Sequence, residues 1–453
     1  RLPQPKAPVR GAGPGVKQAI AAAERRGTIT AAEAKSYRRA FRQAERVRGR
    51  ISSYRSELSA QIAVLKGIAA RGSLSGGRMP ALFLQLRRNT EFFGANPTFP
   101  PRPDITREPC DPPPSSTSSK AGARIVFPGS KIVFQYYPGA ALQLQPLANF
   151  GLANGLITQC RRDPAACDRD GLRQLLSELI AIRSSRGGFI TWEYWFYFGG
   201  GSPPWTSAMS QGTAIQALTR ASEPSILDDK SYLKVAGTAL GAFAKRAPVG
   251  VRAPTSHGAH YLLYSFDPGL RVLNGFLQSI TGLYDYARIA QSKTAHALFH
   301  DGNREARSEL HSFDTGSWSL YSLGGAEATG GYHALVTGFL RNLCQRVKGR
   351  YCTYYKRFKG YATTPPALVY TGAGSTRPGH ALAISYRTNK PTCVIAKVLS
   401  PGGQTAYRAQ LKVARGAHSF SWVPHRRGRF TLELTGLDPL KNKKVVKRSI
   451  RVG

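Results

Sequence analysis

Aromatic residues concentrate in three glycine-rich stretches, residues 187–205, 255–269 and 313–333. Aromatic faces stack on sugar rings, and a phenol can donate a hydrogen bond, accept one, or act as a weak base. Together these side chains could bind and deprotonate a carbohydrate, although core packing explains any one of them taken singly. They are Trp192, Tyr194, Trp195, Phe196, Tyr197, Trp205, His260, Tyr261, Tyr264, Trp318, Tyr321 and Tyr332.

Other catalytic constellations do not fit. The pentapeptide 313–317 matches the active-site turn of pepsin-like proteases, but that chemistry needs two carboxylates that share a proton. The sequence has no second Asp-Thr-Gly or Asp-Ser-Gly, and it has no G-x-S-x-G, P-loop lysine motif or H-E-x-x-H. A glycosidase needs two flanking carboxylates, and the carboxylates of this region form no recognisable pair: Glu193, Asp267, Asp285, Asp314 and Glu327.

The charge balance points to an anionic partner. Lys and Arg number 64 against 25 Asp and Glu, which gives a net charge of 64 − 25 = +39. Such a chain favours nucleic acid, an anionic surface or an acidic polysaccharide, unless the whole proteome is basic. Charge alone supports nucleic-acid binding, and no further motif adds to it.

The six cysteines favour an oxidising compartment. Cys160 with Cys167, and Cys344 with Cys352, are close enough to close small loops, whereas Cys110 and Cys393 can pair only if distant segments meet. No C-x-x-C pair or zinc-finger spacing is present, so we expect no metal site, and six reduced buried thiols are the alternative. The first residue is Arg1, consistent with a removed targeting segment. No apolar run reaches the roughly 18 residues of a membrane span.

Four regions follow from composition and periodicity. Residues 1–95 are a basic helical region, in which the capping box at Thr30–Glu33 opens a long helix towards Gly67. Residues 96–122 are a Pro- and Ser-rich linker. Residues 123–363 begin with a hairpin around Pro128-Gly129, and residues 364–453 alternate with period two as in an immunoglobulin- or fibronectin-like β-sandwich.

The fold class predicted for the whole chain is mainly α. Amphipathic helices joined by aromatic loops favour an α/α toroid over a plain bundle for the catalytic domain. It carries a small N-terminal β-hairpin element, follows a helical arm and precedes the C-terminal β-sandwich. The expected helices span residues 142–160, 170–185, 208–221, 230–245, 270–290, 295–311 and 333–347.

Four motifs in this order carry a family resemblance: "WTSAMSQGTAIQALTRA" (205–221), "YLLYSFDPGLRVLNGFLQSITGLYDYARI" (261–289), "DTGSWSLYSL" (314–323) and "GYHALVTGFLRNL" (331–343). Over roughly residues 130–350 the chain resembles the C-terminal catalytic domain of D-glucuronyl C5-epimerases, which modify heparosan-type polysaccharides. The resemblance implies inversion of C5 of glucuronic acid within a polymer. It gives no sign of a cofactor or a metal.

The resemblance also implies roles for particular residues. Tyr264, Tyr321 and Tyr332 fall on the family's catalytic tyrosines, which would remove and return the C5 proton. Gln211 and Asn274 fall on its substrate-binding amides. The remaining substrate-binding candidates are His260, His333, Arg271 and Trp205. Asp314 would cap or orient the loop that carries Tyr321.

Two positions depart from the family pattern. Leu263 stands where the family has Glu, and Gly324 stands where it has Arg. The sequence therefore predicts an exported or cell-surface epimerase for an acidic polysaccharide, and two alternatives stay open: an inactive glycan-binding or cell-wall protein of the same fold, and a lyase that abstracts the same proton. Nucleic-acid binding is not expected, and a homodimer is left open.

Overall fold

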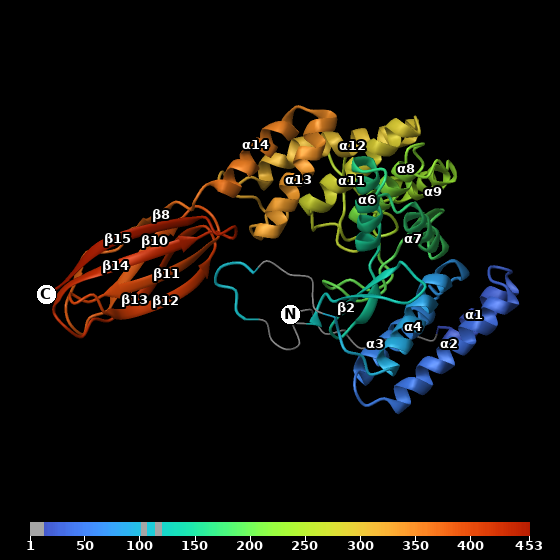
Figure 1. Ribbon diagram of the computed structural model, residues 1–453, viewed down its shortest axis with the longest axis horizontal. Helices are drawn as coiled ribbons and strands as arrows, with labels where there is room; N and C mark the ends of the chain where they lie inside the picture. Colours follow the sequence, from blue (N-terminus) through green and yellow to red (C-terminus); the bar gives the residue numbers. More distant parts are fainter. Residues whose placement is uncertain (1–12, 101–106, 114–119) are drawn as a thin grey trace. The chain divides into compact units, whose positions relative to one another are not determined.

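A computed structural model describes residues 13–100, 107–113 and 120–453 (Figure 1). The chain forms two compact units. The first contains residues 1–104 and 114–306, and the second contains residues 105–113 and 307–453. Helices dominate the first unit, and the second joins helices to a β-rich C-terminal region. The coarse prediction, mainly helical with a C-terminal β-region, is confirmed, and the toroidal arrangement of the helices stays a prediction.

The N-terminal region is helical, with α1 (Val16–Arg25), α2 (Ala31–Arg50), α3 (Arg55–Ala70) and α4 (Met79–Gly94). The predicted capping box is confirmed: Glu33 N–H donates to Thr30 Oγ1 at 3.2 Å, and Thr30 N–H donates to Glu33 Oε2 at 2.7 Å. The single long helix towards Gly67 is wrong. The chain breaks after Arg50, and Tyr54 adopts φ 57°, a left-handed conformation that a helix cannot continue.

A three-stranded sheet follows, formed by β1 (Arg124–Val126), β2 (Val133–Tyr137) and β3 (Ala141–Leu144). The predicted hairpin is β1–β2. The helix expected from residue 142 begins only at Pro146, because residues 141–144 pair with β2 instead. The buried carboxylate of Glu57 fixes the turn between β2 and β3, because it accepts hydrogen bonds from Tyr136 O–H at 2.7 Å and Ala141 N–H at 2.9 Å.

The rest of the first unit is built around α8 (Ala208–Ala221), which packs against α6 (Pro146–Arg162) and α11 (Leu273–Ile289). Glycines allow α8 and α11 to approach closely: a Cβ on Gly212 would lie 2.5 Å from Ser279 Cα. The other elements are α7 (Arg169–Ala181), β4 (Ser184–Arg186), β5 (Phe189–Thr191), α9 (Ser231–Ala239), α10 (Gly241–Ala244), β6 (Arg252–Pro254), β7 (Ala259–Tyr261) and α12 (Lys293–Glu309).

Two predicted helices of this unit differ from the structure. The helix expected over 230–245 is divided into α9 and α10, and Gly241 at the break lies so close to β5 that a Cβ would be 2.4 Å from Phe189 Cβ. The helix expected to reach residue 185 ends at Ala181, because residues 184–186 pair with β5. In both cases contacts with β5 override the helical periodicity of the local sequence.

In the second unit, α13 (Gly330–Val347) and α14 (Arg350–Thr363) pack together and precede the β-strands. One sheet has the order β13-β10-β8 and the other β12-β11-β14-β15-β9. The strands are β8 (Leu368–Tyr370), β9 (Ser375–Thr376), β10 (Leu382–Thr388), β11 (Thr392–Leu399), β12 (Thr405–Val413), β13 (Gly416–Trp422), β14 (Gly428–Leu437) and β15 (Lys443–Val452).

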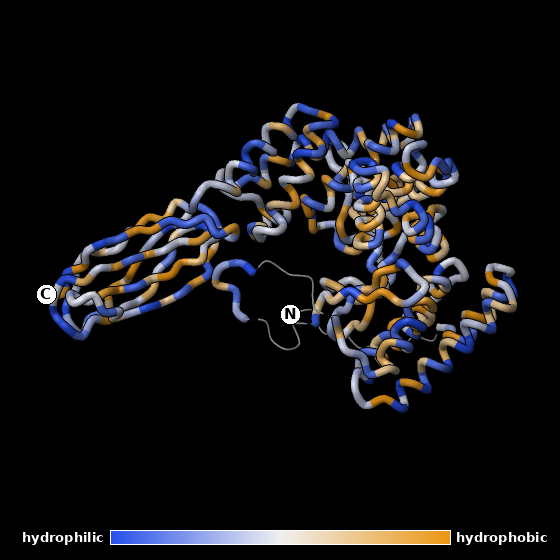
Figure 2. The backbone as a smooth tube through the Cα atoms, in the orientation of Figure 1, coloured by the Kyte–Doolittle hydropathy of each residue, from blue (hydrophilic) through white to orange (hydrophobic). Residues whose placement is uncertain are grey.

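These two sheets share one apolar core, to which β10 contributes Ile384 and Tyr386 and β14 contributes Leu432 and Leu434. Hydrophobic and hydrophilic residues alternate along the strands (Figure 2). The predicted β-rich region with period-two strands is therefore confirmed, and its immunoglobulin- or fibronectin-like topology stays a prediction.

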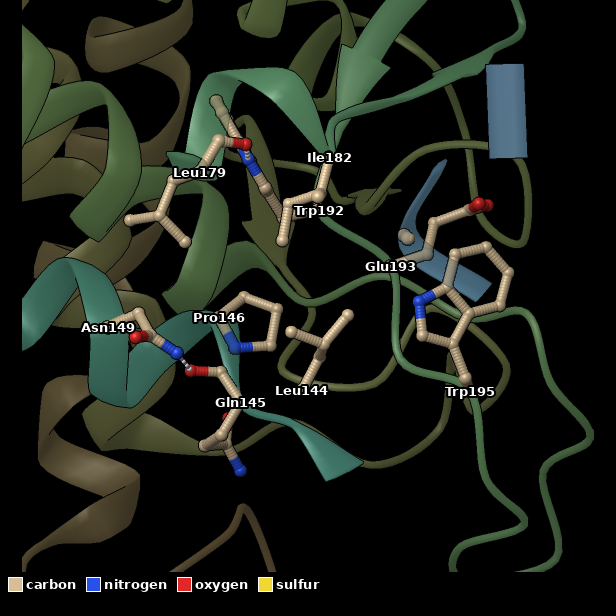
Figure 3. Close-up of a pocket in the computed structure, with 10 residues that line it drawn as sticks. Leu144, Gln145, Pro146, Asn149, Leu179, Ile182, Trp192, Glu193 and Trp195 are labelled. Atoms are coloured by element: carbon tan, nitrogen blue, oxygen red, sulfur yellow. Dashed lines mark hydrogen bonds between the residues drawn. The ribbon is translucent and has the colours of Figure 1, made fainter. Parts of the chain in front are cut away.

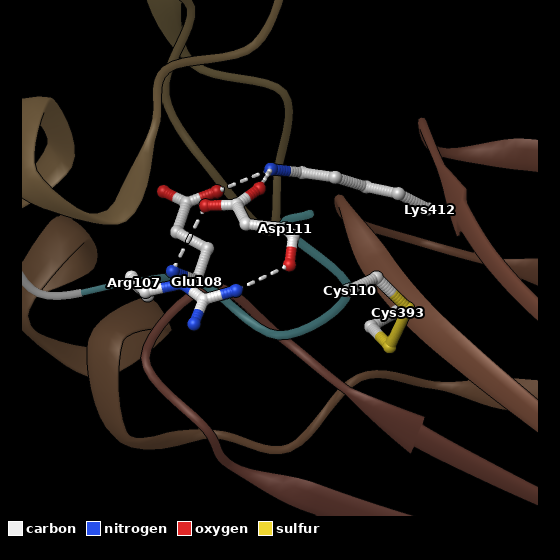
Figure 4. Close-up of a disulfide and its surroundings, with 6 residues drawn as sticks. All are labelled: Arg107, Glu108, Cys110, Asp111, Cys393 and Lys412. Carbon is white, nitrogen blue, oxygen red and sulfur yellow. Dashed lines mark hydrogen bonds and ion pairs between the residues drawn. A yellow bond between two sulfur atoms is a disulfide. The ribbon is translucent and has the colours of Figure 1, made fainter. Parts of the chain in front are cut away.

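All six cysteines are paired. The two short loops close as Cys160–Cys167 and Cys344–Cys352, as the sequence suggests. Cys110 pairs with Cys393 across 283 residues, which fixes residues 107–113 on the sandwich (Figure 4). Across the described ranges, none of the helices has both the length and the apolar character that crossing a membrane requires.

Removing the long-range disulfide should cost far more stability than removing a local one. In the chain-entropy treatment, closing a loop of this length is worth about 5 kcal/mol, against about 2 kcal/mol for a loop of seven or eight residues. The double variant Cys110→Ser/Cys393→Ser should therefore lower the unfolding midpoint of the second unit more than Cys160→Ser/Cys167→Ser lowers that of the first. Thiol titration of the denatured, unreduced wild type should find no free thiol, and two or more titratable thiols per chain would contradict the pairing.

Candidate active site

The structure brings two of the three predicted catalytic tyrosines together. The rings of Tyr321 and Tyr332 lie 4.8 Å apart between centroids, tilted by 58°. Tyr332 lies in the first turn of α13, which begins at Gly330 rather than at the predicted His333, and its N–H donates to Thr329 Oγ1 at 3.3 Å. With 42% of its surface exposed, Tyr332 can meet a polymer from solvent.

Tyr321 lies on a short hairpin shaped by backbone bonds. Its N–H donates to the Ala326 carbonyl at 2.9 Å, and Ala328 N–H donates to the Ser319 carbonyl at 2.8 Å. Gly324 forms the turn with φ +66°, a conformation that favours glycine over the arginine of the family pattern. The glycine at position 324, where the family has arginine, therefore matches the backbone conformation of this turn.

Asp314 orients this loop, as the sequence suggested. Its Oδ1 accepts from Gly316 N–H at 2.8 Å and from Tyr361 O–H at 3.0 Å, and its Oδ2 lies 3.0 Å from Arg357 Nε. Arg357 and Tyr361 are four residues apart on α14, so one helix face supplies both partners. The Asp-Thr-Gly of the protease-like pentapeptide is a loop anchor here.

His333 is a fixed internal bridge. It is fully buried, stacked on Trp318 at 3.8 Å, and bonded through Nδ1 to Ser319 Oγ at 2.8 Å and through Nε2 to the Phe358 carbonyl at 3.0 Å. Because a carbonyl only accepts, Nε2 carries the proton and Nδ1 accepts from the hydroxyl. Burial lowers the pKa of His333 to about 4. The ring is therefore neutral at pH 7, and this geometry favours positioning of the hairpin over neutralising a substrate carboxylate.

The C-terminal sandwich and residues 107–113 also bind the loop that carries Tyr321. Glu108 Oε1 accepts from Gly330 N–H at 2.6 Å, and Glu108 Oε2 binds Lys412 Nζ at 2.9 Å (Figure 4). Glu327 accepts from Arg415 N–H at 3.1 Å, and Ser317 Oγ donates to the Asn389 carbonyl. Sequence reasoning missed these partners, because they lie between about 70 and 300 residues apart and no local pattern marks them.

Tyr264 belongs to an aromatic cluster in the first unit. The cluster consists of Tyr137, Tyr194, Phe196, Phe198, Trp205, Tyr264 and Phe266. Trp205, predicted to contact substrate, is buried; it stacks on Tyr194 at 4.2 Å and donates through Nε1 to the Phe196 carbonyl at 2.9 Å. Tyr264 lies edge-on to Trp205 at 5.7 Å and is only half-buried. The cluster therefore gives Tyr264 a rigid apolar support.

The two predicted substrate amides are buried. Gln211 accepts from Trp192 N–H at 3.1 Å and donates to the Ile190 carbonyl at 3.2 Å, so it ties α8 to β5. Asn274 is the second residue of α11, and its Oδ1 accepts from Gly275 N–H at 2.8 Å. Gln211 is fully buried and Asn274 is 3% exposed. Direct contact with a polysaccharide would require these side chains to leave their present bonds.

The predicted cation and second histidine lie near α11 and α12. Arg271 NH1 is 3.5 Å from Glu305 Oε1, a carboxylate that also accepts from Thr255 Oγ1 at 2.6 Å. His260 is fully buried in β7, with its ring 4.1 Å from that of Phe276. Arg271 is the more accessible of these candidates, at 30% exposure of its side chain.

Burial separates structural tyrosines from those that could titrate in a reaction. Burial raises the pKa of Tyr194 and of Tyr261, and the hydroxyl of Tyr261 donates to the Leu298 carbonyl at 2.6 Å. A phenol in such surroundings resists ionisation and makes a poor base. Tyr264, Tyr321 and Tyr332 are at least partly exposed, as is Tyr197, so each keeps the solvent access that proton transfer to a sugar needs.

A small, partly open cavity in the first unit does not suit a sugar. It measures about 10 Å³ and is lined by mostly apolar groups, including Leu144, Pro146 and Trp192 (Figure 3). Glu193 borders it, but its carboxylate is bound by Arg78 at 2.8 Å and by Arg186 at 2.7 Å. A larger groove of about 480 Å³ runs between α2 and α4, away from the candidate residues. Among the residues that the structure describes, none gather as a metal-binding group of three or more His, Cys, Asp or Glu.

Comparison with known proteins agrees with the resemblance of the motifs. The family described as the D-glucuronyl C5-epimerase C-terminus matches residues 186–360. The D-glucuronyl C5-epimerase of Caenorhabditis elegans is 37% identical over 134 residues, which cover 27% of this chain. Residues 186–360 are therefore similar to this family, over less than half of the chain. The match covers 21% of the length of the nematode protein.

Solved structures are more distant. A sugar epimerase from a ruminal bacterium has 10% identity and a TM-score of 0.38, over 57% of this chain and 68% of that one. A D-mannose isomerase has 13% identity and the same TM-score, over 51% of this chain and 63% of that one. At this level of similarity neither structure carries an argument about the fold or the site.

Two substitutions at Asp314 should separate its hydrogen bonds from its ion pair with Arg357. Asp314→Asn keeps an oxygen for Gly316 N–H but loses the charge opposite Arg357, and we expect a cost of about 1 kcal/mol. Asp314→Ala loses the ion pair and both hydrogen bonds and should cost about 2–3 kcal/mol. Denaturant unfolding of the second unit measures both variants. Equal costs would show that the loop does not depend on the carboxylate's bond to Gly316.

Burial of His333 should make stability depend on acidity. Its folded-state pKa of about 4 lies below the ordinary 6.5, so the unfolded chain binds more protons between these values. The contribution of neutral, buried His333 to the free energy of unfolding is complete above about pH 6.5. It is lost as pH falls through about 4, by up to about 3 kcal/mol. His333→Gln should be less stable at pH 7 yet flatten this pH dependence, whereas His380→Gln, at an exposed position, should not. A wild-type slope retained in His333→Gln would refute the assignment.

Proposed function

We propose that the chain is a uronate C5-epimerase that inverts glucuronic acid residues within an acidic polysaccharide. The match of residues 186–360 to the C5-epimerase C-terminal family is the observation that carries the proposal. The adjacent Tyr321 and Tyr332, on a loop fixed by Asp314 and His333, agree with it. An α/α toroid built from the helices of this region belongs to the same proposal.

The proposed chemistry is proton exchange at one carbon. A base removes the C5 proton beside the uronate carboxylate, negative charge builds on that carboxylate, and an acid returns a proton to the opposite face. Tyr264, Tyr321 and Tyr332 are the proposed base and acid, since one phenol can act as phenolate and another as phenol. No bond other than C5–H breaks, so no redox partner is required.

A positive field would assist both binding and ionisation of a phenol. The net charge of +39 attracts a polyanion and favours the phenolate. Arg357 and Arg415 lie at the ends of the Tyr321 loop, although Asp314 and Glu327 engage them. Arg271 is the proposed substitute for the family arginine that Gly324 replaces.

Export of the protein is part of the proposal. All six cysteines form disulfides, which persist in oxidising compartments. An extracellular acidic polysaccharide, at or near a cell surface, would be the substrate.

Leu263 favours a second candidate, a glycan-binding protein without turnover. Leu263 is buried and packs on Gly275, where an added Cβ would lie 3.0 Å from Leu263 Cδ1. The position is apolar, so the carboxylate expected from the family pattern has no counterpart there. Such a protein would bind the polysaccharide and exchange no proton, whereas a lyase would leave an unsaturated product that absorbs ultraviolet light.

Substitution of Tyr321 tests the catalytic proposal. In heavy water the wild type should incorporate deuterium at C5 of a glucuronate polymer, with label in both epimers. Tyr321→Phe keeps the ring against Tyr332 and removes the hydroxyl, so inversion should fall by about 100-fold or more while binding persists. Deuterium content at C5, measured by mass spectrometry and NMR, gives the rate.

Tyr407→Phe is the matched control, because Tyr407 stacks on Phe420 in the sandwich, outside the family segment. It should keep wild-type exchange. If the wild type exchanges no C5 proton with any uronate polymer, the enzyme proposal fails and the binding protein becomes the better account.

A further inference from the structure

The C-terminal sandwich is one of two strongly basic parts of the chain; residues 1–95 carry the same net charge, 19 − 5 = +14. Residues 364–453 contain 16 Lys and Arg against 2 Asp and Glu, a net charge of 16 − 2 = +14 in one fifth of the sequence. Asp438 is fully buried and pairs with buried Lys390 at 3.1 Å. Glu433 is therefore the one carboxylate that the sandwich itself presents to solvent.

Strand register places the cations on one face of the five-stranded sheet. Leu432 and Leu434 of β14 point into the core, so Glu433 between them points outward. The neighbours of Glu433 in register are Lys397 of β11 and Lys447 of β15, and Arg408 of β12 lies beside Lys397. One row thus crosses four strands, about 14 Å at the usual strand spacing.

A second row and the end of β15 extend this face. Arg429 lies opposite Arg451 in the β14–β15 ladder, and Lys443 lies opposite Leu437. We call this surface the basic sheet face; it consists of Lys397, Arg408, Arg429, Lys443, Lys447 and Arg451, of which all but the half-buried Lys397 are exposed. Along β15 its cations recur every four residues, about 13 Å apart.

The basic sheet face is electrostatically unbalanced. Lys397 with Arg408, and Arg429 with Arg451, are like-charge pairs directly opposite each other, an arrangement that destabilises a sheet. Glu433 pairs with Lys447 at 3.1 Å. Within the described residues, no carboxylate forms an ion pair with the other five cations of the face. An anionic ligand would relieve this repulsion.

Protection of a sheet edge does not explain the pattern. Lysines on open sheet edges prevent strand-to-strand association, and this accounts for Lys444 and Arg448, on the part of β15 that β9 does not pair. Lys397, however, lies on β11, which is paired on both sides by β12 and β14. A cation on a central strand has no edge to protect, so its place in the row needs another reason.

We propose that the basic sheet face is an accessory site that binds an acidic polysaccharide, the substrate class of the proposed function on which this inference rests. Rows of cations on one face of a sheet suit a polysaccharide that carries one carboxylate per repeating unit and lies across the strands. The face lies outside residues 186–360, so it would retain the polymer rather than take part in proton transfer.

The test compares two sets of substitutions in the full chain. The face variant is Lys397→Gln/Arg408→Gln/Arg429→Gln/Arg451→Gln. The control removes four charges from exposed arginines of α2: Arg39→Gln/Arg42→Gln/Arg46→Gln/Arg50→Gln. Binding to an unsulfated glucuronate polysaccharide is measured by calorimetry from about 0.05 to 0.3 M salt, the range over which screening changes strongly.

We expect the face variant to bind at least about tenfold more weakly and with a shallower salt dependence, and the control to stay within about threefold of wild type. Because like-charge pairs are removed, the face variant should also unfold at the wild-type temperature or above. The two-site variant Arg429→Gln/Arg451→Gln should show a smaller loss of affinity in the same direction.

Equal losses in the face and control variants would overturn the site in favour of net charge alone. Wild-type binding by the face variant, or face-dependent binding of duplex DNA that is tighter than that of the polysaccharide, would also overturn it. Binding is measured in Tyr321→Phe protein as well. Absent C5 exchange in wild type, with face-dependent binding intact, would remove the epimerase and leave this site standing.

Discussion

One carboxylate, that of Glu108, joins the three parts of the second unit. Its two oxygens are bonded to the first N–H of α13 at Gly330 and to the ammonium of Lys412 in β12. A carboxylate at a helix N-terminus is stabilised by the helix dipole, and the lysine adds an opposite charge. Two residues away, the Cys110–Cys393 disulfide keeps Glu108 in place. The start of α13, and with it Tyr332, therefore depends on a segment more than 200 residues earlier.

The chemistry proposed for this family needs few mobile groups and many fixed ones. Several conspicuous side chains of the aromatic loops are fixed: Trp205 stacks on Tyr194, Gln211 ties α8 to β5, and His333 bridges three elements. Their hydrogen bonds are satisfied inside the protein, so what they contribute is rigidity. By contrast, Tyr321 is partly exposed to solvent and Tyr332 is exposed.

Local patterns predicted the parts of the fold that depend on neighbours in sequence. The capping box of α2, the two short disulfide loops and the alternating strands after residue 364 were all readable, since each depends on spacings of fewer than ten residues. The break at Tyr54, the pairing of residues 141–144 with β2 and the division at Gly241 were not. The division at Gly241 is decided by close contact with β5, about fifty residues earlier, whereas the break at Tyr54 and the short β2–β3 hairpin are local features that the helix periodicity did not reveal.

The same division holds for the candidate site. The family motifs pointed to Tyr321 and Tyr332, and the turn at Asp314 was recognisable from Asp-Thr-Gly. No local pattern indicated that Arg357 and Tyr361 would hold Asp314, or that Glu108 would cap α13, because ion pairs between remote segments leave no periodicity. Burial of His333 was equally hidden, and it changes that residue from a proposed substrate contact into an internal support.

The disulfide between Cys110 and Cys393 also gives the molecule a covalent topology that the linear sequence does not show. With the backbone between them it closes a ring that contains the whole family segment, 186–360. Tension applied between the two ends of the chain would pass through the sulfur–sulfur bond and bypass the ring. If the protein is held at one end and pulls on a polymer at the other, the tyrosine loop inside the ring carries none of that load.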